Sequence, residues 1–183
     1  GRGIAQIAAK NGFNVIQVDV NAEMLSKSKA GIESILKKFV EKEKITAQQK
    51  DETLQRIMFT SDINDCIADV IIEAIVEKNE IKQQLFDELL LINNDETIFA
   101  TNTSSISVSA LSENKNYASR FAGMHFFNPA QIMKLVEIIR AEKTSEEIIL
   151  TLVELAKQFG KTPVVCNDAP GFIVNRVART YYL

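Results

Sequence analysis

The sequence predicts an α/β fold built on a doubly wound, mostly parallel sheet. Short apolar runs rich in β-branched residues alternate along the chain with longer segments in which apolar residues recur at helical spacing. The apolar runs are mostly continuous, as expected for strands that helices cover on both faces. Strands are expected at residues 14–19, 57–60, 69–73, 97–100, 120–127, 133–139 and 162–166.

The composition excludes several classes of protein. The 183 residues are 46% hydrophobic and 25% charged, which is ordinary for a globular protein with one sizeable core. The net charge of -3 argues against a general nucleic-acid binder, because neutralising phosphates requires a basic surface. No apolar run approaches the roughly 20 residues that a membrane-spanning helix needs, so we expect no membrane partner. Cys66 and Cys166 lack the spacing of metal ligands, so we predict no metal site, and reduced thiols in an intracellular compartment.

The chain opens with a glycine-rich helix start, G-R-G-I-A-Q. In dinucleotide-binding folds a strand and a tight G-x-G turn precede such a helix, so that backbone N–H groups face a pyrophosphate. About 20 residues further on, these folds place a carboxylate that binds both ribose hydroxyls of NAD and repels the 2′-phosphate of NADP. Asp19 ends the first expected strand and suits this role, and its alternative role is to cap the helix that follows.

Helical periodicity predicts a hairpin of two helices after Asp19. The first covers residues 22–44, and Thr46 is expected to cap the second, which ends near Arg56. Lysines on the outer faces are expected to be solvated. Further helices are expected at residues 78–91, from near Ser107, at residues 145–159, and from Asp168 to the end of the chain. The predicted buried stripe of the helix at 78–91 is Ile81, Leu85, Leu89 and Ile92.

Candidate ligand-binding segments follow two of the expected parallel strands. Ligands of open α/β sheets bind beyond the carboxyl ends of the strands, and residues 74–77 and 101–105 lie at such ends. The five small polar residues at 101–105 can donate hydrogen bonds to a cofactor, but on the residues alone we favour capping of the helix that begins near Ser107. Glu77 and Lys82 are equally compatible with a surface ion pair.

The single histidine of the chain, His125, lies in a predicted two-stranded unit with a turn at Asn128-Pro129. Alternation along the two strands places His125 on one apolar stripe and Glu137 on another. A buried carboxylate needs a partner, and pairing with it would orient the imidazole and raise its basicity. The residues support such an acid/base pair as well as its alternative, a core histidine bonded to backbone with Glu137 on a solvated edge.

Six blocks of sequence, in one order, resemble the L-3-hydroxyacyl-CoA dehydrogenase family, which includes the 3-hydroxybutyryl-CoA dehydrogenases. The blocks are G-R-G-I-A-Q, I-I-E-A-I-V-E, A-T-N-T-S-S, H-F-F-N-P with M-K-L-V-E, G-K-T-P-V-V, and D-A-P-G-F-I-V-N-R. The resemblance implies a Rossmann-type NAD-binding domain at residues 1–167, with a helical-hairpin insertion, and the start of a C-terminal helical domain at residues 168–183. It also implies a chain truncated at both ends, without its first strand and the first two glycines of G-x-G-x-x-G.

The resemblance assigns roles to individual residues. His125 would be the catalytic base, oriented by Glu137, while Ser104 and Asn175 would hold substrate oxygens. Lys42 would contact the coenzyme A moiety of the substrate. The residues that would contact the cofactor are Gly1, Asp19, Ala74, Glu77, Lys82, Asn102, Ser104 and Asn128. On the residues alone, Asn175 has the alternative role of bonding a neighbouring loop.

The implied reaction is the reversible, NAD-dependent oxidation of an (S)-3-hydroxyacyl-CoA to a 3-oxoacyl-CoA, in fatty-acid or butyrate metabolism. The implied partners are the acyl-CoA substrate and a second copy of the protein, bound through the C-terminal domain. The cytoplasm is the expected compartment, with the mitochondrial matrix as the alternative. Two other functions stay open: dehydrogenation of a free hydroxy acid, as in the gulonate-type enzymes, and a non-catalytic NAD-binding structural protein. The isolated segment could also be folded yet inert, with an exposed apolar patch around Val177, Tyr181 and Leu183.

Overall fold

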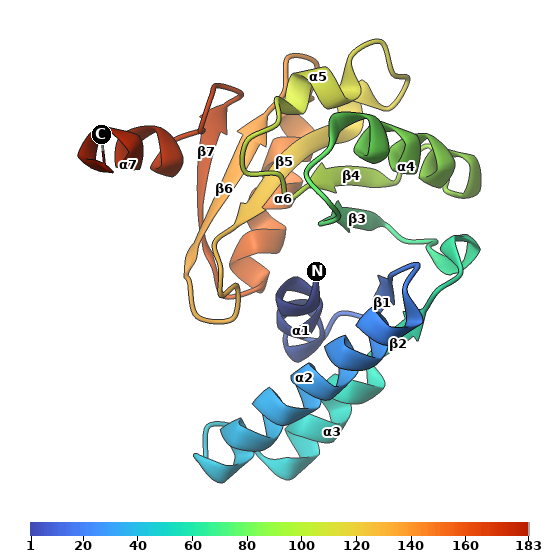
Figure 1. The fold of residues 1–183 in the computed structure, drawn as a ribbon, viewed down its shortest axis with the longest axis vertical. Coiled ribbons are helices and arrows are strands. Elements are labelled where there is room, and N and C mark those ends of the chain that lie inside the picture. The colour runs from blue at the N-terminus through green and yellow to red at the C-terminus, as the bar shows by residue number, and fades with distance from the viewer. Residues whose placement is uncertain (183) are drawn as a thin grey trace. The chain divides into compact units, whose positions relative to one another are not determined.

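The computed structural model describes the backbone of residues 1–182 and the side chains of residues 1–178 (Figure 1). The chain forms two compact units. The N-terminal unit comprises Gly1–Cys66 together with Asn128–Ile132, and the C-terminal unit comprises Ile67–Phe127 together with Met133–Leu183. The strands form two sheets, one of two strands and one of five. The expectation that one continuous sheet has lost its first strand, and the domain boundary near residue 167, both stay predictions.

The N-terminal unit is built on a parallel pair of strands. Helix α1 (Arg2–Lys10) leads into β1 (Val15–Val18), which pairs with β2 (Ile57–Thr60). The crossover between them is the predicted helical hairpin, α2 (Ala22–Glu41) and α3 (Ala47–Gln55), and η1 (Ile63–Asp65) follows β2. Thr46 caps α3 as predicted, in a capping box with Gln49. The buried core consists of Ala9, Ile32, Leu36 and Ile57.

The C-terminal unit is built on a sheet with the strand order β3-β4-β5-β6-β7. Its strands are β3 (Val70–Glu73), β4 (Ile98–Thr101), β5 (Phe121–Phe126), β6 (Leu135–Arg140) and β7 (Thr162–Asn167). Every neighbouring pair is parallel except β5 and β6, which are antiparallel. Its helices are α4 (Asn79–Ile92), α5 (Val108–Ser112), η2 (Ala118–Arg120), α6 (Glu146–Gln158) and α7 (Val174–Tyr182). Helix α6 packs against β5, β6 and β7, and in Figure 1 it passes behind the sheet.

The buried face of α4 differs from the predicted stripe. Lys82, Phe86 and Leu89 are buried, whereas Ile81 is 41% exposed. The prediction is confirmed at Leu89, but earlier in the helix the inward face is shifted by one residue, from Ile81 and Leu85 to Lys82 and Phe86. Aromatic packing accounts for the shift, because the Phe86 ring meets the Phe121 ring edge to face, with centroids 4.9 Å apart.

Phe86→Ala is expected to lower the free energy of unfolding by about 3–5 kcal/mol. The Phe86 side chain is fully buried and packs against Phe99, Tyr117 and Phe121, so its removal leaves a cavity among rigid rings. Urea unfolding, monitored by circular dichroism, measures the loss in the free energy of unfolding. Ile81→Ala, on the exposed side of the same helix, is the control and should cost less than about 1 kcal/mol. Equal losses for the two variants would contradict the observed orientation of α4.

Helix α7 begins later than predicted, at Val174 rather than directly after Asp168. Gly171 and Phe172 have φ angles of +75° and +49°, which a right-handed helix cannot contain. The residues before Val174 are therefore a tight turn, and the predicted helix start at Asp168 is wrong. Asp168 instead accepts hydrogen bonds from the Ser107 hydroxyl, at 2.7 Å, and the Ser109 N–H, at 2.8 Å, and so ties the end of β7 to α5.

The predicted apolar patch on α7 is described in part. Val177 is 54% exposed, as expected for a residue of such a patch. The side chains of Tyr181 and Leu183 lie outside the described residues. The extent of the patch therefore stays a prediction.

Candidate active site

His125 and Glu137 form a hydrogen-bonded pair inside the five-stranded sheet. The antiparallel register of β5 and β6 places the two residues directly opposite each other, and His125 Nδ1 lies 2.8 Å from Glu137 Oε2. The His125 residue is 6% exposed and Glu137 is 1% exposed. A carboxylate can only accept a hydrogen bond, so Nδ1 carries the proton that bridges them, and Nε2 is the nitrogen left to exchange a proton.

The second oxygen of Glu137 binds the start of α7. Glu137 Oε1 accepts hydrogen bonds from the Ile173 N–H at 3.0 Å and the Val174 N–H at 2.9 Å. These are backbone donors that a helix cannot satisfy at its first turn, and a carboxylate there also complements the helix dipole. No sequence pattern indicates this contact. It explains how a fully buried acid is satisfied, because three donors surround it.

Aromatic rings hold the imidazole from two sides. The centroid of the His125 ring is 4.6 Å from that of Phe127 and 5.9 Å from that of Phe172. Phe172 is itself buried, in the turn that precedes α7. The ring orientation is therefore fixed by packing as well as by the bond to Glu137.

The segment after β4 reaches the residues around His125. Asn102 Oδ1 accepts a hydrogen bond of 2.8 Å from the N–H of Phe126, the residue next to His125. The Asn175 side-chain amide donates to the backbone carbonyl of Ser104 over 3.4 Å. The alternative expectation for Asn175, a bond to a neighbouring loop, is therefore confirmed. These contacts place Asn102 beside the strand of His125 and Asn175 beside Ser104.

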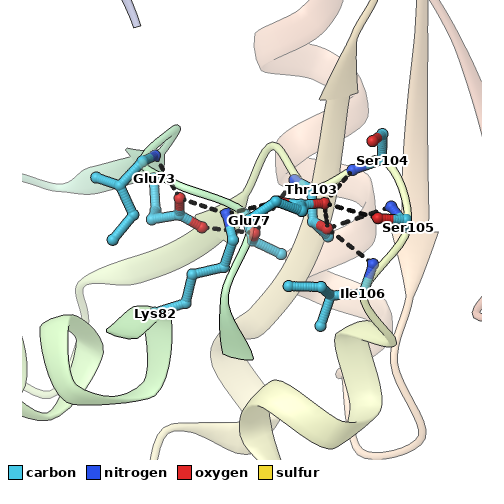
Figure 2. Close-up of polar contacts among 9 residues, drawn as sticks. Glu73, Glu77, Lys82, Thr103, Ser104, Ser105 and Ile106 are labelled. Carbon is cyan, nitrogen blue, oxygen red and sulfur yellow. Dashed lines mark hydrogen bonds and ion pairs between the residues drawn. The ribbon is translucent and has the colours of Figure 1, made fainter. Parts of the chain in front are cut away.

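Glu77 binds the turn formed by residues 103–105, shown in Figure 2. Its Oε1 accepts hydrogen bonds from the Thr103 hydroxyl, from the Ser104 N–H at 3.0 Å and from the Ser105 hydroxyl at 3.1 Å. Its Oε2 lies 3.1 Å from Lys82 Nζ. Partial burial raises the pKa of Glu77, but the hydrogen bond from Thr103 and the hydrogen bond and charge of Lys82 outweigh it and lower the pKa to about 2.

The expectation that residues 101–105 cap α5 is wrong. The cap is Ser107, whose hydroxyl oxygen accepts a hydrogen bond from the Ala110 N–H at 3.1 Å. The hydroxyls of Thr101 and Thr103 instead donate to the carboxylates of Glu73 and Glu77. The carboxylates compete successfully for these hydroxyls because charged acceptors form stronger hydrogen bonds than neutral ones. The contacts could not be predicted, because no local sequence pattern places Glu73 and Glu77 beside residues 101–105.

Lys82 is buried between two acids. Lys82 Nζ lies 2.6 Å from Glu73 Oε1, and the two side chains are 1% and 0% exposed. Glu73 also accepts hydrogen bonds from the Ile75 N–H at 2.6 Å and the Thr101 hydroxyl at 2.7 Å. Glu77 and Lys82 do form an ion pair, but the expectation that it lies at the surface is wrong for Lys82, because its ammonium group is buried. Glu73 was not among the predicted site residues, although an acid at the carboxyl end of an apolar strand indicates a ligand-binding position.

The remaining predicted cofactor and substrate residues lie elsewhere. Ala74, half-buried, directly follows β3 in the C-terminal unit. Gly1, Asp19, Lys42 and Asn128 lie in the N-terminal unit. Lys42 is an exposed residue at the end of α2, and the exposed Asn128 precedes Pro129 through a cis peptide bond.

Two features of the N-terminal unit fit a bound dinucleotide. Gly1 begins α1 without a side-chain cap, and the first turn of α1 contains no acidic residue, which suits a pyrophosphate at the positive end of the helix. Asp19 follows β1, and its Oδ1 accepts a hydrogen bond of 3.0 Å from the Asn21 N–H. The cap of α2 is Asn21, so the alternative role of Asp19 as a cap is wrong.

No group of three or more His, Cys, Asp or Glu side chains among the described residues could hold a metal ion. None of the helices in this part of the chain is long and apolar enough to cross a membrane.

The mostly parallel sheet and the polar residues beyond its strand ends define a Rossmann-like domain of the kind that binds dinucleotides. Residues 1–169 match the family model described as 3-hydroxyacyl-CoA dehydrogenase, NAD binding domain. The chain belongs to this family. The fold class and the family expected from the six sequence blocks are both confirmed, and membership identifies NAD as the cofactor.

Known relatives are similar over the whole chain. The 3-hydroxyadipyl-CoA dehydrogenase of Escherichia coli is 44% identical over 183 residues, which are 100% of this chain and 38% of that protein. The mitochondrial hydroxyacyl-coenzyme A dehydrogenase of Sus scrofa is 42% identical, over 100% of this chain and 60% of its own length. The crystal structure of an Escherichia coli 3-hydroxybutyryl-CoA dehydrogenase superposes with a TM-score of 0.97 at 43% identity, over 99% of this chain and 39% of the other. This chain thus spans between 38% and 60% of the lengths of these proteins.

Proposed function

We propose that the protein catalyses the reversible, NAD-dependent oxidation of an (S)-3-hydroxyacyl-CoA, with 3-hydroxybutyryl-CoA as its substrate, to the 3-oxoacyl-CoA. The observation that supports this most directly is the 2.8 Å contact between His125 Nδ1 and the buried Glu137 carboxylate. The names of the relatives support the substrate class, because each is a dehydrogenase of a 3-hydroxyacyl or hydroxyacyl thioester of coenzyme A. We place the reaction in fatty-acid or butyrate metabolism.

The oxidation removes a hydride from the carbinol carbon and a proton from its hydroxyl group. NAD, when bound, supplies the nicotinamide that accepts the hydride. His125 Nε2 would take the hydroxyl proton, because loss of the hydride alone would leave a high-energy protonated ketone. Glu137 would keep the ring in the productive tautomer and stabilise the imidazolium ion as it forms.

Ser104 and Asn175 are the proposed contacts to the substrate oxygens. Their side-chain hydroxyl and amide are donors, and donors of this kind typically contribute a few kcal/mol to stabilising charge that develops in the transition state. The 3.4 Å contact between the Asn175 amide and the Ser104 carbonyl supports the proposal, because it brings the two residues side by side. Lys42 is the proposed contact to coenzyme A, in keeping with its exposed position.

The proposed NAD contacts can be grouped by the part of the cofactor that each residue suits. Gly1, at the start of α1, suits the pyrophosphate, and Asp19 suits the adenosine ribose. Ala74, Glu77, Asn102 and Ser104 lie at the carboxyl ends of β3 and β4, where open α/β sheets bind ligands. Lys82 and Asn128 complete the set that the family resemblance implies.

Asp19→Ser is expected to lower the preference for NAD over NADP at least about tenfold, expressed as the ratio of the two kcat/KM values. The change removes a carboxylate that would bind both ribose hydroxyls and repel a 2′-phosphate. Initial rates with each cofactor measure the ratio. Asp62→Ser is the control, because Asp62 caps η1 after the neighbouring strand β2 and should not alter the ratio. An unchanged preference in Asp19→Ser would remove Asp19 from the cofactor site.

An assay of the full-length protein with acetoacetyl-CoA and NADH tests the proposed function. Consumption of NADH that depends on acetoacetyl-CoA is expected, since the reaction is reversible. A protein that binds NADH but does not consume it would instead be the non-catalytic NAD-binding protein considered above. Turnover of a free hydroxy acid in preference to 3-hydroxybutyryl-CoA would identify the gulonate-type alternative.

The remaining parts of the proposal concern partners and location. We infer a homodimer that forms through a C-terminal domain, as the family resemblance implies. We also infer a cytoplasmic protein, or a protein of the mitochondrial matrix if its source is eukaryotic, as one relative is named mitochondrial. The acidic net charge of -3 supports the absence of a nucleic-acid partner.

A further inference from the structure

A chain of polar contacts runs from the end of β3 to the turn at residues 103–105 (Figure 2). It begins at Glu73, whose two oxygens are bound by Lys82, the Ile75 N–H and the Thr101 hydroxyl. Lys82 then contacts Glu77 as well as Glu73. Glu77 in turn binds three groups of the turn through a single oxygen, Oε1.

The burial of this chain changes from one end to the other. The side chains of Glu73 and Lys82 are 0% and 1% exposed, whereas that of Glu77 is 36% exposed. The buried end is fixed, because three donors surround Glu73 and the surrounding protein excludes water. The exposed end is the turn, where Ser104 is accessible to a ligand. Rigid buried contacts therefore support a part of the site that faces outward.

Stability alone is a weak explanation for these buried charges. Removing a carboxylate and an ammonium group from water costs several kcal/mol per ion, and apolar residues of similar size are often as stable. Such a pair is better explained where it fixes the geometry of another group. In this structure the pair fixes Glu77. Among the described contacts of the Glu77 carboxylate, Lys82 is the one cation.

We propose that Glu73 and Lys82 are positioning residues that act through Glu77 to hold the turn at residues 103–105, and with it Ser104, in its functional orientation. The inference rests on the proposed role of Ser104 in substrate binding. It adds a positioning role to the proposed cofactor contact of Lys82, because the ammonium group is held between the carboxylates of Glu73 and Glu77.

Lys82→Met tests the proposal without substrate or cofactor. Methionine nearly matches the length of lysine and suits a buried position, but it cannot bind Glu77. Amide hydrogen exchange of the full-length protein without ligands should be at least about tenfold faster at Ser104 and Ile106 in the variant. These two N–H groups donate to Glu77 and to the Thr103 hydroxyl in the native turn. Unchanged protection at both amides would overturn the proposal.

A double-mutant cycle with Ser104→Ala tests the link to function. Lys82→Met should lower kcat about 10- to 100-fold when Ser104 is present, since misplacing a substrate contact by a small distance has an effect of this order. In the Ser104→Ala background the same change should lower kcat less than about twofold, because the group it positions is gone. Equal losses in both backgrounds would show a general structural role and would overturn the inference.

Lys115→Met is the matched control. Like Lys82, Lys115 pairs with an acid, in its case Asp87 of α4 at 2.6 Å. Among the described hydrogen bonds, Lys115 makes none to the turn at residues 103–105. It should change neither the exchange of Ser104 nor kcat by more than about twofold. An effect equal to that of Lys82→Met would count against the proposal.

Glu73→Gln covers the case in which Lys82→Met does not fold. Glutamine keeps the shape of the side chain but removes the charge that fixes Lys82, and faster exchange at Ser104 is again expected. Native protection in Glu73→Gln would overturn the proposal. If the unaltered protein shows no turnover of acetoacetyl-CoA, the proposed function fails, and the exchange experiment still decides whether the positioning exists.

Discussion

His125→Ala is expected to lower kcat for the oxidation of 3-hydroxybutyryl-CoA by about 10²- to 10⁴-fold, the usual contribution of a positioned general base. The sequence contains no second histidine that could replace it. The imidazole is held by Glu137 at 2.8 Å and by two aromatic rings, so its position depends on the fold and not on the substrate. Initial rates of NADH formation at saturating cofactor measure the change.

The control for His125→Ala is the affinity for NADH, measured by the quenching or enhancement of its fluorescence. We expect this affinity to stay within about threefold of the original, because the base acts on the hydroxyl proton and not on the dinucleotide. His125→Gln is a second variant, whose amide can still donate to Glu137 but cannot take up a proton at neutral pH. Either variant with a rate within about tenfold of the original would refute His125 as the base.

Glu137→Gln is expected to lower kcat by at least about 10²-fold. Glu137 uses both of its oxygens as acceptors, one for His125 and one for the first N–H groups of α7. Glutamine has one acceptor oxygen, so one of the two contacts must fail. If the oxygen stays on α7, the amide donates to Nδ1 of His125 and forces the proton onto Nε2, where the base is needed.

The opposite orientation of the introduced glutamine side chain has a different consequence. If its oxygen accepts from His125, the N–H groups of Ile173 and Val174 lose their acceptor, at a cost of about 1–3 kcal/mol in the free energy of unfolding. Measuring kcat together with urea unfolding therefore separates the two orientations. The matched control is Glu146→Gln, which neutralises an acid exposed on α6. Full activity together with full stability in Glu137→Gln would contradict the bridging role of Glu137.

Much of the fold could be predicted from the sequence, because the signals are local. The expected strands and helices are present, and the capping box of Thr46 and Gln49 is formed as such a motif indicates. Alternation along the strands at residues 120–139 placed His125 and Glu137 on apolar stripes but left their pairing open, and the register of β5 and β6 decides in favour of the pair. Where the prediction failed, as at α4 and at the start of α7, distant residues compete with the local pattern.

Part of the site could not be predicted, because it consists of contacts between residues far apart in the chain. Glu137 and Val174 are brought together by the fold, and neither a spacing nor a repeat relates them. The same holds for Glu77 and Ser105, whose contact joins the ends of two neighbouring parallel strands. The sequence could predict only that the segments at residues 74–77 and 101–105 lie beyond the ends of strands. Which acid would meet which hydroxyl depends on strand order and on helix rotation.

The sequence by itself determined the family and the two residues that could form an acid/base pair, because sequence blocks and strand alternation are local signals. The register of β5 and β6, which only the tertiary structure supplies, placed Glu137 opposite His125. The tertiary structure alone decided that Glu137 also binds the start of α7, and that Lys82 is buried between Glu73 and Glu77. The physical reason is that a charged group can be buried only where donors and acceptors converge from several elements, and that convergence exists only in the folded protein.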